Sequence, residues 1–162
     1  MTSSQRSFVC LVCLVAFSAA TASAQTTWYW DNFGGTANDW TSIDNWSLNA
    51  AGTVPAAALP DGTGFAQFNV STLVSAQTVN LNSDPSLLGL LFSSPAAVTL
   101  QGGGANRVLT FGTGGITKSG TGVATIGSAT ANQNVALTLG GTQAWAKNMT
   151  CPHEWNQRLS PG

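Results

Sequence analysis

The 162-residue sequence predicts a single all-β domain, and three observations lead to this prediction. Charged residues make up only 7% of the chain, against about 25% in a typical globular domain. Glu occurs once and Lys twice, so the residues that usually fill exposed helix positions are scarce. Short apolar segments instead alternate with Ser, Thr, Asn and 18 Gly, a pattern typical of strands joined by turns.

Residues 1–24 are interpreted as a secretory signal peptide. Arg6 precedes an apolar run over residues 8–17, and small residues then lead to the A-x-A site Ala22-Ser23-Ala24 before Gln25. The apolar run is shorter than the roughly 20 residues of a membrane span. We therefore expect cleavage between Ala24 and Gln25, no membrane span in the mature chain, and export to the cell surface, the extracellular space or the periplasm.

The mature chain divides into three regions by composition. Residues 25–60 contain four of the six Trp and are interpreted as an aromatic-rich N-terminal cap. Residues 61–146 are poor in charge and carry the repeating strand pattern. Residues 147–162 contain the only His and the only Glu, and we expect this atypical tail to be disordered, as the product of a truncated or frame-shifted gene.

Period-two alternation predicts strands in the middle region. Apolar side chains alternate with Gly, Thr or Ala over residues 88–92, 98–100, 109–111 and 135–139. Turn residues, among them Gly102-Gly103-Gly104, separate these segments.

The spacing of the predicted strands suggests stacked repeats. Val79, Val98, Ile116 and Val135 follow one another at intervals of 19, 18 and 19 residues. A fixed period with short strands predicts a β-solenoid in which these four side chains share one ladder. The same register places Leu137 inward, so Leu137→Asp is expected to be severely destabilising. The alternative is an antiparallel β-sandwich, which also has regularly spaced strands.

The order of several short segments resembles the bacterial autotransporter-associated β-strand repeat proteins. The segments that carry the resemblance are Trp30-Asp31, Asp39-Trp40, Asn45-Trp46-Ser47, Leu59-Pro60-Asp61, Phe65-Ala66-Gln67-Phe68, Val79-Asn80-Leu81, Leu88-Gly89-Leu90-Leu91-Phe92, Val98-Thr99-Leu100, Leu109-Thr110-Phe111 and Leu137-Thr138-Leu139. They fall within residues 28–146. The resemblance implies an exported right-handed parallel β-helix like an autotransporter passenger, with a structural or surface-adhesion role and a surface or polysaccharide partner.

Catalytic and metal chemistry find little support in the sequence. The single His, His153, lies in the tail beside Cys151 and is poorly placed for a nucleophilic pair, whose members normally converge from distant segments. The five Asp stand beside Gly, Asn, Pro, Trp or Ser, which favours turn and capping roles. Asp39, Asp44 and Asn45 could supply oxygen ligands to Ca²⁺ but lack a recognised spacing.

These observations predict a protein without enzyme activity or cofactor. A net charge of −1 gives no basic field for nucleic acid, so we expect no nucleic-acid partner.

An aromatic cluster is the one feature with binding character. We use this name for the side chains of Trp28, Trp30, Trp40 and Trp46. They could stack on sugar rings, as in a secreted carbohydrate-binding module, or they could cover an end of the solenoid. We favour the second interpretation, which predicts that Trp30, Trp40 and Trp46 are buried and that Trp40→Ala lowers the melting temperature.

Overall fold

The computed structural model describes residues 24–32, 38–69 and 74–142. Residues 1–23 of the signal peptide predicted over residues 1–24, and the tail predicted over residues 147–162, lie outside these ranges. Ala24 and Gln25, the residues of the expected cleavage site, are exposed and precede the first strand.

The described chain is all-β, as the sequence predicts, with one short 3-10 helix, η1 (Ile43–Asn45). Its strands are β1 (Thr27–Trp30), β2 (Trp46–Ser47), β3 (Phe65–Phe68), β4 (Gln77–Asn80), β5 (Ser86–Phe92), β6 (Val98–Gln101), β7 (Arg107–Lys118), β8 (Ala124–Ile126) and β9 (Val135–Leu139). Within the described ranges, no helix has the length and apolar character to cross a membrane.

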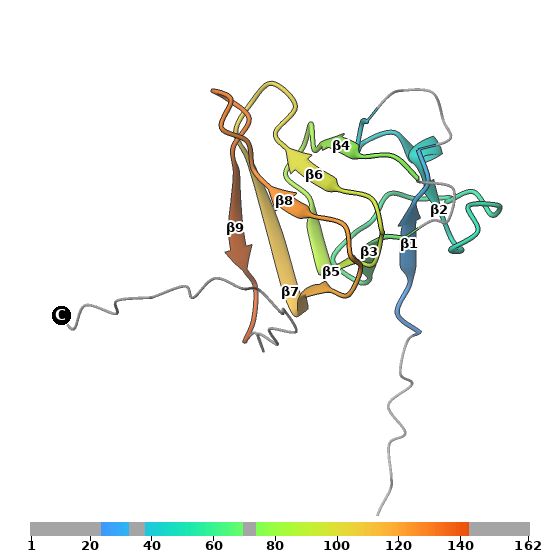
Figure 1. Ribbon diagram of the computed structural model, residues 1–162. Coiled ribbons are helices and arrows are strands. Elements are labelled where there is room, and N and C mark those ends of the chain that lie inside the picture. The colour runs from blue at the N-terminus through green and yellow to red at the C-terminus, as the bar shows by residue number, and fades with distance from the viewer. Residues whose placement is uncertain (1–23, 33–37, 70–73, 143–162) are drawn as a thin grey trace, which may run out of the picture.

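The strands form two sheets, and the chain alternates between them from β3 to β9. One sheet, called sheet A, has the order β2-β1-β3-β5-β7-β9, and sheet B has the order β4-β6-β8. All neighbouring strands pair in parallel except β1 and β2, so sheet A is mixed. The parallel pairing contradicts the antiparallel β-sandwich alternative. Figure 1 shows β1 and β2 at one side of the molecule and β9 at the other.

The core lies between the two sheets and follows from the alternation within each strand. Every second side chain of β4, β6 and the first half of β7 is buried, and its neighbours are exposed or half-buried. The fully buried aliphatic and phenyl side chains, at most 1% exposed, are Phe68, Val79, Leu81, Leu87, Leu90, Leu100, Leu109 and Phe111. Burial of such side chains is the main favourable contribution to folding, about 25 cal/mol per Å² of apolar surface.

The predicted 19-residue ladder is wrong. Val79 and Val98 both lie in sheet B, but Val79 is opposite Leu100 rather than Val98. Ile116 and Val135 lie in sheet A, where Ile116 is opposite Leu90 and Val135 is opposite Arg107.

The spacing between paired residues is longer and less regular than predicted. In sheet A, Phe65 is opposite Gly89, 24 positions on, and Leu90 is opposite Ile116, 26 positions on. The register also shifts between Leu87 and Gly89. Alternation determines only which residues share a face, whereas the lengths of the connections decide which strand residues are paired.

Candidate functional site

The aromatic cluster lies at the β1–β2 end of sheet A. Trp28 and Trp30 come from β1, and Trp46 opens β2, which pairs antiparallel with β1 so that Trp30 is opposite Trp46. Trp40 precedes η1, and its backbone nitrogen donates a hydrogen bond to the carbonyl oxygen of Asn80 at the end of β4. One aromatic group thus connects the β1 end of sheet A with the β4 end of sheet B.

The indole rings pack against one another at steep angles. The ring centroids of Trp40 and Trp46 lie 4.7 Å apart with 73° between the planes, and those of Trp30 and Trp46 lie 5.2 Å apart with 80°. Edge-to-face pairs of this kind are favourable beyond the area that they bury. The Trp46 Nε1–H donates a buried hydrogen bond of 3.0 Å to the carbonyl oxygen of Trp40.

Phe68 belongs to this group although the sequence analysis left it out. Its ring centroid is 6.1 Å from Trp30, 6.1 Å from Trp46 and 6.4 Å from Trp40. It also stacks on Phe92 of β5, with 5.4 Å between the centroids and 14° between the planes. Phe68 and Phe92 are opposite each other in the β3–β5 register. The alternation in Phe65-Ala66-Gln67-Phe68 was a signal for an inward Phe68, but only the pairing brings it to the tryptophans.

All four predicted tryptophans are buried. Trp30 is 0% exposed, Trp40 and Trp46 are 1% exposed, and Trp28 is 5% exposed. The prediction that Trp30, Trp40 and Trp46 are buried is therefore confirmed. A sugar-stacking platform needs an indole face open to water, and these positions leave none, because Trp30, Trp40 and Trp46 pack around one aromatic group and Trp28 is also buried.

Two of the described acidic residues, Asp39 and Asp61, stabilise turns. Asp39 Oδ1 accepts hydrogen bonds from the backbone nitrogen of Thr41 at 2.9 Å and from Thr41 Oγ1 at 2.7 Å. Asp61 Oδ1 accepts the same pair from Thr63, at 2.8 Å and 2.6 Å. This is the local side-chain-to-backbone pattern of a turn, and it confirms the turn role expected for these two residues.

The hydrogen bonds shift the pKa of both carboxyl groups. Burial raises the pKa of Asp39, but the hydrogen bonds from Thr41 and Asn82 outweigh it, and the pKa is lowered. The side-chain and backbone hydrogen bonds from Thr63 lower the pKa of Asp61, against a small opposing effect of burial.

The lowered pKa values predict acid sensitivity. A carboxyl whose pKa is lower in the folded state stabilises the fold above its unfolded pKa of about 3.9, and this contribution is lost as the pH falls through the folded pKa. We expect the melting temperature to be level from neutral pH to about pH 5 and to fall below about pH 4. Asn still accepts both turn hydrogen bonds but does not titrate, so Asp39→Asn/Asp61→Asn should flatten this fall. An equally steep fall in the double variant would contradict the prediction.

Of the possible Ca²⁺ ligands, Asp39 and Asn45 form hydrogen bonds within the protein, whereas Asp44 is exposed. Asp39 is bonded to Thr41, the Asn45 Nδ2–H donates to the carbonyl oxygen of Asp39 at 2.9 Å, and Asp44 lies exposed in the first turn of η1. Among the described residues, no group of three or more His, Cys, Asp or Glu is arranged to hold a metal ion. Cys151 and His153 lie outside the described residues.

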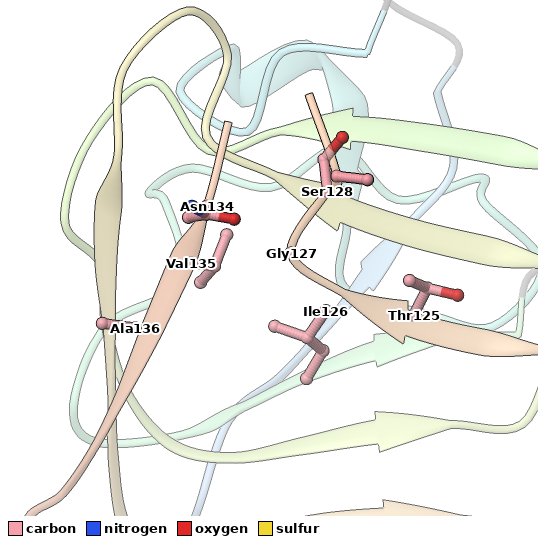
Figure 2. Close-up of a pocket in the computed structure, with 8 residues that line it drawn as sticks. Thr125, Ile126, Gly127, Ser128, Asn134, Val135 and Ala136 are labelled. Atoms are coloured by element: carbon pink, nitrogen blue, oxygen red, sulfur yellow. The ribbon is translucent and has the colours of Figure 1, made fainter. Parts of the chain in front are cut away.

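A hollow of about 540 Å³ lies at the opposite end of the molecule, between β8 and β9. The sequence analysis did not identify it. Figure 2 shows Ile126 and Val135 on the two strands that border it, with Gly127, Ser128 and Asn134 on the connection between them. The lining has no charged side chain, so it offers neither an acid nor a base for catalysis.

Comparison of the chain with protein-family models, with curated proteins and with solved structures found no match.

Proposed function

We propose that this chain is an exported structural or surface-adhesion protein, built as a right-handed parallel β-helix of the autotransporter-associated repeat type, with no catalytic role. The observation that carries the proposal is the alternation of the chain between two sheets whose successive strands pair in parallel. A chain that returns to the same sheet after each crossing and pairs in parallel there extends as a coil. Parallel crossover connections are overwhelmingly right-handed, which supports the proposed hand.

The surface chemistry supports a structural role. The described outer face of sheet B carries Thr78, Thr99 and Thr125 in one file, because the register places Thr78 opposite Thr99 and Thr99 opposite Thr125. Beside it, Gln101 Nε2 donates a 2.8 Å hydrogen bond to Asn80 Oδ1 across the two strands. The hydroxyl and amide groups of such a face form hydrogen bonds with water, so the face stays hydrated with few charged side chains.

The hydrogen bonds of Asp39, Asp61 and Asp84 support the proposal that the protein has no catalytic role. Asp39 and Asp61 hold turns, and Asp84 Oδ1 accepts a 3.0 Å hydrogen bond from the backbone nitrogen of Val108, which joins the connection before β5 to β7. These carboxylates belong to separate connections rather than to one cleft. Glycoside hydrolysis, by contrast, needs two carboxyl groups that face each other across a substrate.

Export is tested by expressing the full chain in a bacterial host and sequencing the N-terminus of the protein recovered outside the cytoplasm. We expect the recovered protein to begin at Gln25, because Ala22-Ser23-Ala24 forms the cleavage site. Exported protein that still begins at Met1 would contradict the signal peptide, and protein retained in the cytoplasm would contradict the proposed location.

The adhesion role is tested on whole cells. Cells that display the chain should bind a surface or a matrix polysaccharide more strongly than cells without it, and hydrolysis of glycans should be absent. Saturable binding of a soluble sugar that is lost in Trp40→Ala, with the melting temperature unchanged, would overturn the structural reading of the aromatic cluster.

A further inference from the structure

The edge strands at the two ends of the stacked sheets differ in whether another segment covers them. At the N-terminal end, β2 covers β1. The segment after β2 then folds back on it, with hydrogen bonds from Leu48 N to Val54 O at 2.8 Å and from Ala56 N to Trp46 O at 3.0 Å. Pro55, which bridges to Ser47, has no N–H to offer a further strand. Prolines at an edge are a known protection against strand addition.

The N-terminal end of sheet B is covered as well. Asn80 N donates to Asn38 O at 2.6 Å, and Trp40 N donates to Asn80 O at 2.9 Å. The segment that contains Trp40 therefore occupies the free edge of β4, and the buried indole closes the apolar interior behind it.

The C-terminal end has no such cover in the described part of the chain. We use this name for β8, β9 and the connection over residues 127–134. β8 is the last strand of sheet B and β9 is the last of sheet A. Leu137 is opposite Leu109, and Leu139 is opposite Phe111. Leu109 and Phe111 are 0% exposed, whereas Leu137 is 43% exposed and Leu139 is 47% exposed.

The side chains that should be core thus lie at a surface. Leu137 and Leu139 of β9 lie next to the inward-facing Leu109 and Phe111 of β7 and point to the same side of sheet A. The hollow of about 540 Å³ lies beside them and is bordered by Ile126 and Val135. Figure 1 shows β9 at the outer side of the molecule, beside β7. Inward-facing leucines on an edge strand next to a hollow are features of an interface.

The C-terminal end also carries no charges that would repel a second copy of the same surface. Residues 119–142 contain no Asp, Glu, Lys, Arg or His. Neither β8 nor β9 contains Pro or Lys, the residues that most often prevent edge pairing. A charged partner would find no complementary group here, whereas a second neutral surface of the same shape meets no repulsion.

We propose that the C-terminal end is a docking surface for the same end of a second copy of this chain. The covered N-terminal end cannot accept β9, so head-to-tail growth is blocked and the contact must be between like ends. A two-fold axis between two copies of β9 reverses one of them, so the two edges pair antiparallel and Leu137 and Leu139 face their counterparts. Such a contact closes on itself and stops at a dimer. The inference depends on the strand pairings, on the exposure of Leu137 and Leu139 and on the absence of charge over residues 119–142, and not on the proposed role outside the cell.

The test measures the association state of the full chain by sedimentation velocity over a broad range of concentrations. We expect a reversible monomer–dimer equilibrium. Leu137→Lys places two unpaired charges in the contact and should raise the dimer dissociation constant by about tenfold or more. Leu48→Lys is the matched control, because Leu48 is 42% exposed at the covered N-terminal end, and it should leave the equilibrium unchanged.

A second variant guards against misfolding of the first. Thr138→Lys adds a charge to the exposed outer face of β9 without altering the inward files, and should also weaken the dimer. Open-ended oligomers, or equal weakening by Leu48→Lys, would overturn the proposal. A monomer at every concentration would also overturn it, and slow amide hydrogen exchange in β9 of that monomer would show that another part of the same chain is the occupant.

Discussion

Trp46→Ala is expected to lower the free energy of unfolding by about 3–5 kcal/mol, the range for truncating a buried Trp. Trp46 is 1% exposed and its ring contacts Trp30, Trp40 and Phe68. Its removal leaves a cavity between β1 and the segment that covers β4, and it leaves the carbonyl oxygen of Trp40 without its indole donor. Urea denaturation followed by circular dichroism measures the loss, and the melting temperature should fall by roughly 10 °C or more.

Two controls separate packing from hydrogen bonding at this position. Trp46→Phe keeps an aromatic ring but removes the Nε1–H donor, so it should cost clearly less than Trp46→Ala. Val54→Ala alters a side chain at the same end of the molecule that is already 46% exposed, and should change the stability by less than about 1 kcal/mol. If Trp46→Ala costs no more than Val54→Ala, the aromatic cluster does not hold this end together.

Leu109→Asp is expected to lower the free energy of unfolding by about 4 kcal/mol or more, a large part of the roughly 5–15 kcal/mol that stabilises an ordinary domain. Leu109 is 0% exposed in β7, between β5 and β9. A carboxylate there has no partner and either is buried with its charge or takes up a proton, and both outcomes oppose folding. The measurement is the midpoint of urea unfolding, or the loss of soluble protein on expression.

The matched control is Leu137→Asp, on the residue opposite Leu109. Leu137 is 43% exposed, so its new carboxylate stays hydrated, and the cost should be below about 1 kcal/mol when measured at a concentration where the chain is monomeric. The sequence alone predicted a severe effect at Leu137, and its exposure corrects that expectation. Equal losses at the two positions would mean that Leu137 is covered in solution.

Several features of the site could be predicted from residues alone. The burial of Trp30, Trp40 and Trp46 follows from their size and from the need to cover a strand edge, and the structure confirms it. The turn roles of Asp39 and Asp61 follow from short-range chemistry, because the donors lie two residues along the chain at Thr41 and Thr63. In each case the physical cause acts locally or belongs to the side chain itself.

The register could not be predicted in the same way. Val79, Val98, Ile116 and Val135 share an interval but not a sheet, since the first two lie in sheet B and the last two in sheet A. The register depends on the number of positions between paired residues of neighbouring strands, and the lengths of the connections determine that number. Connections of different lengths and the shift after Leu87 made it irregular.

The sequence by itself determined that the described chain is all-β, that alternate residues of β6 and of the first half of β7 share a face, and that Trp30, Trp40 and Trp46 are buried. Only the tertiary structure decided which strands are neighbours and that, within the described residues, the β1–β2 end is covered whereas the β8–β9 end is not. Leu109 and Leu137 have the same local pattern, Leu-Thr followed by an apolar residue, and they face the same side of sheet A. One is core and the other is surface, because burial depends on whether a further strand lies beyond, and alternation within a strand carries no information about that neighbour.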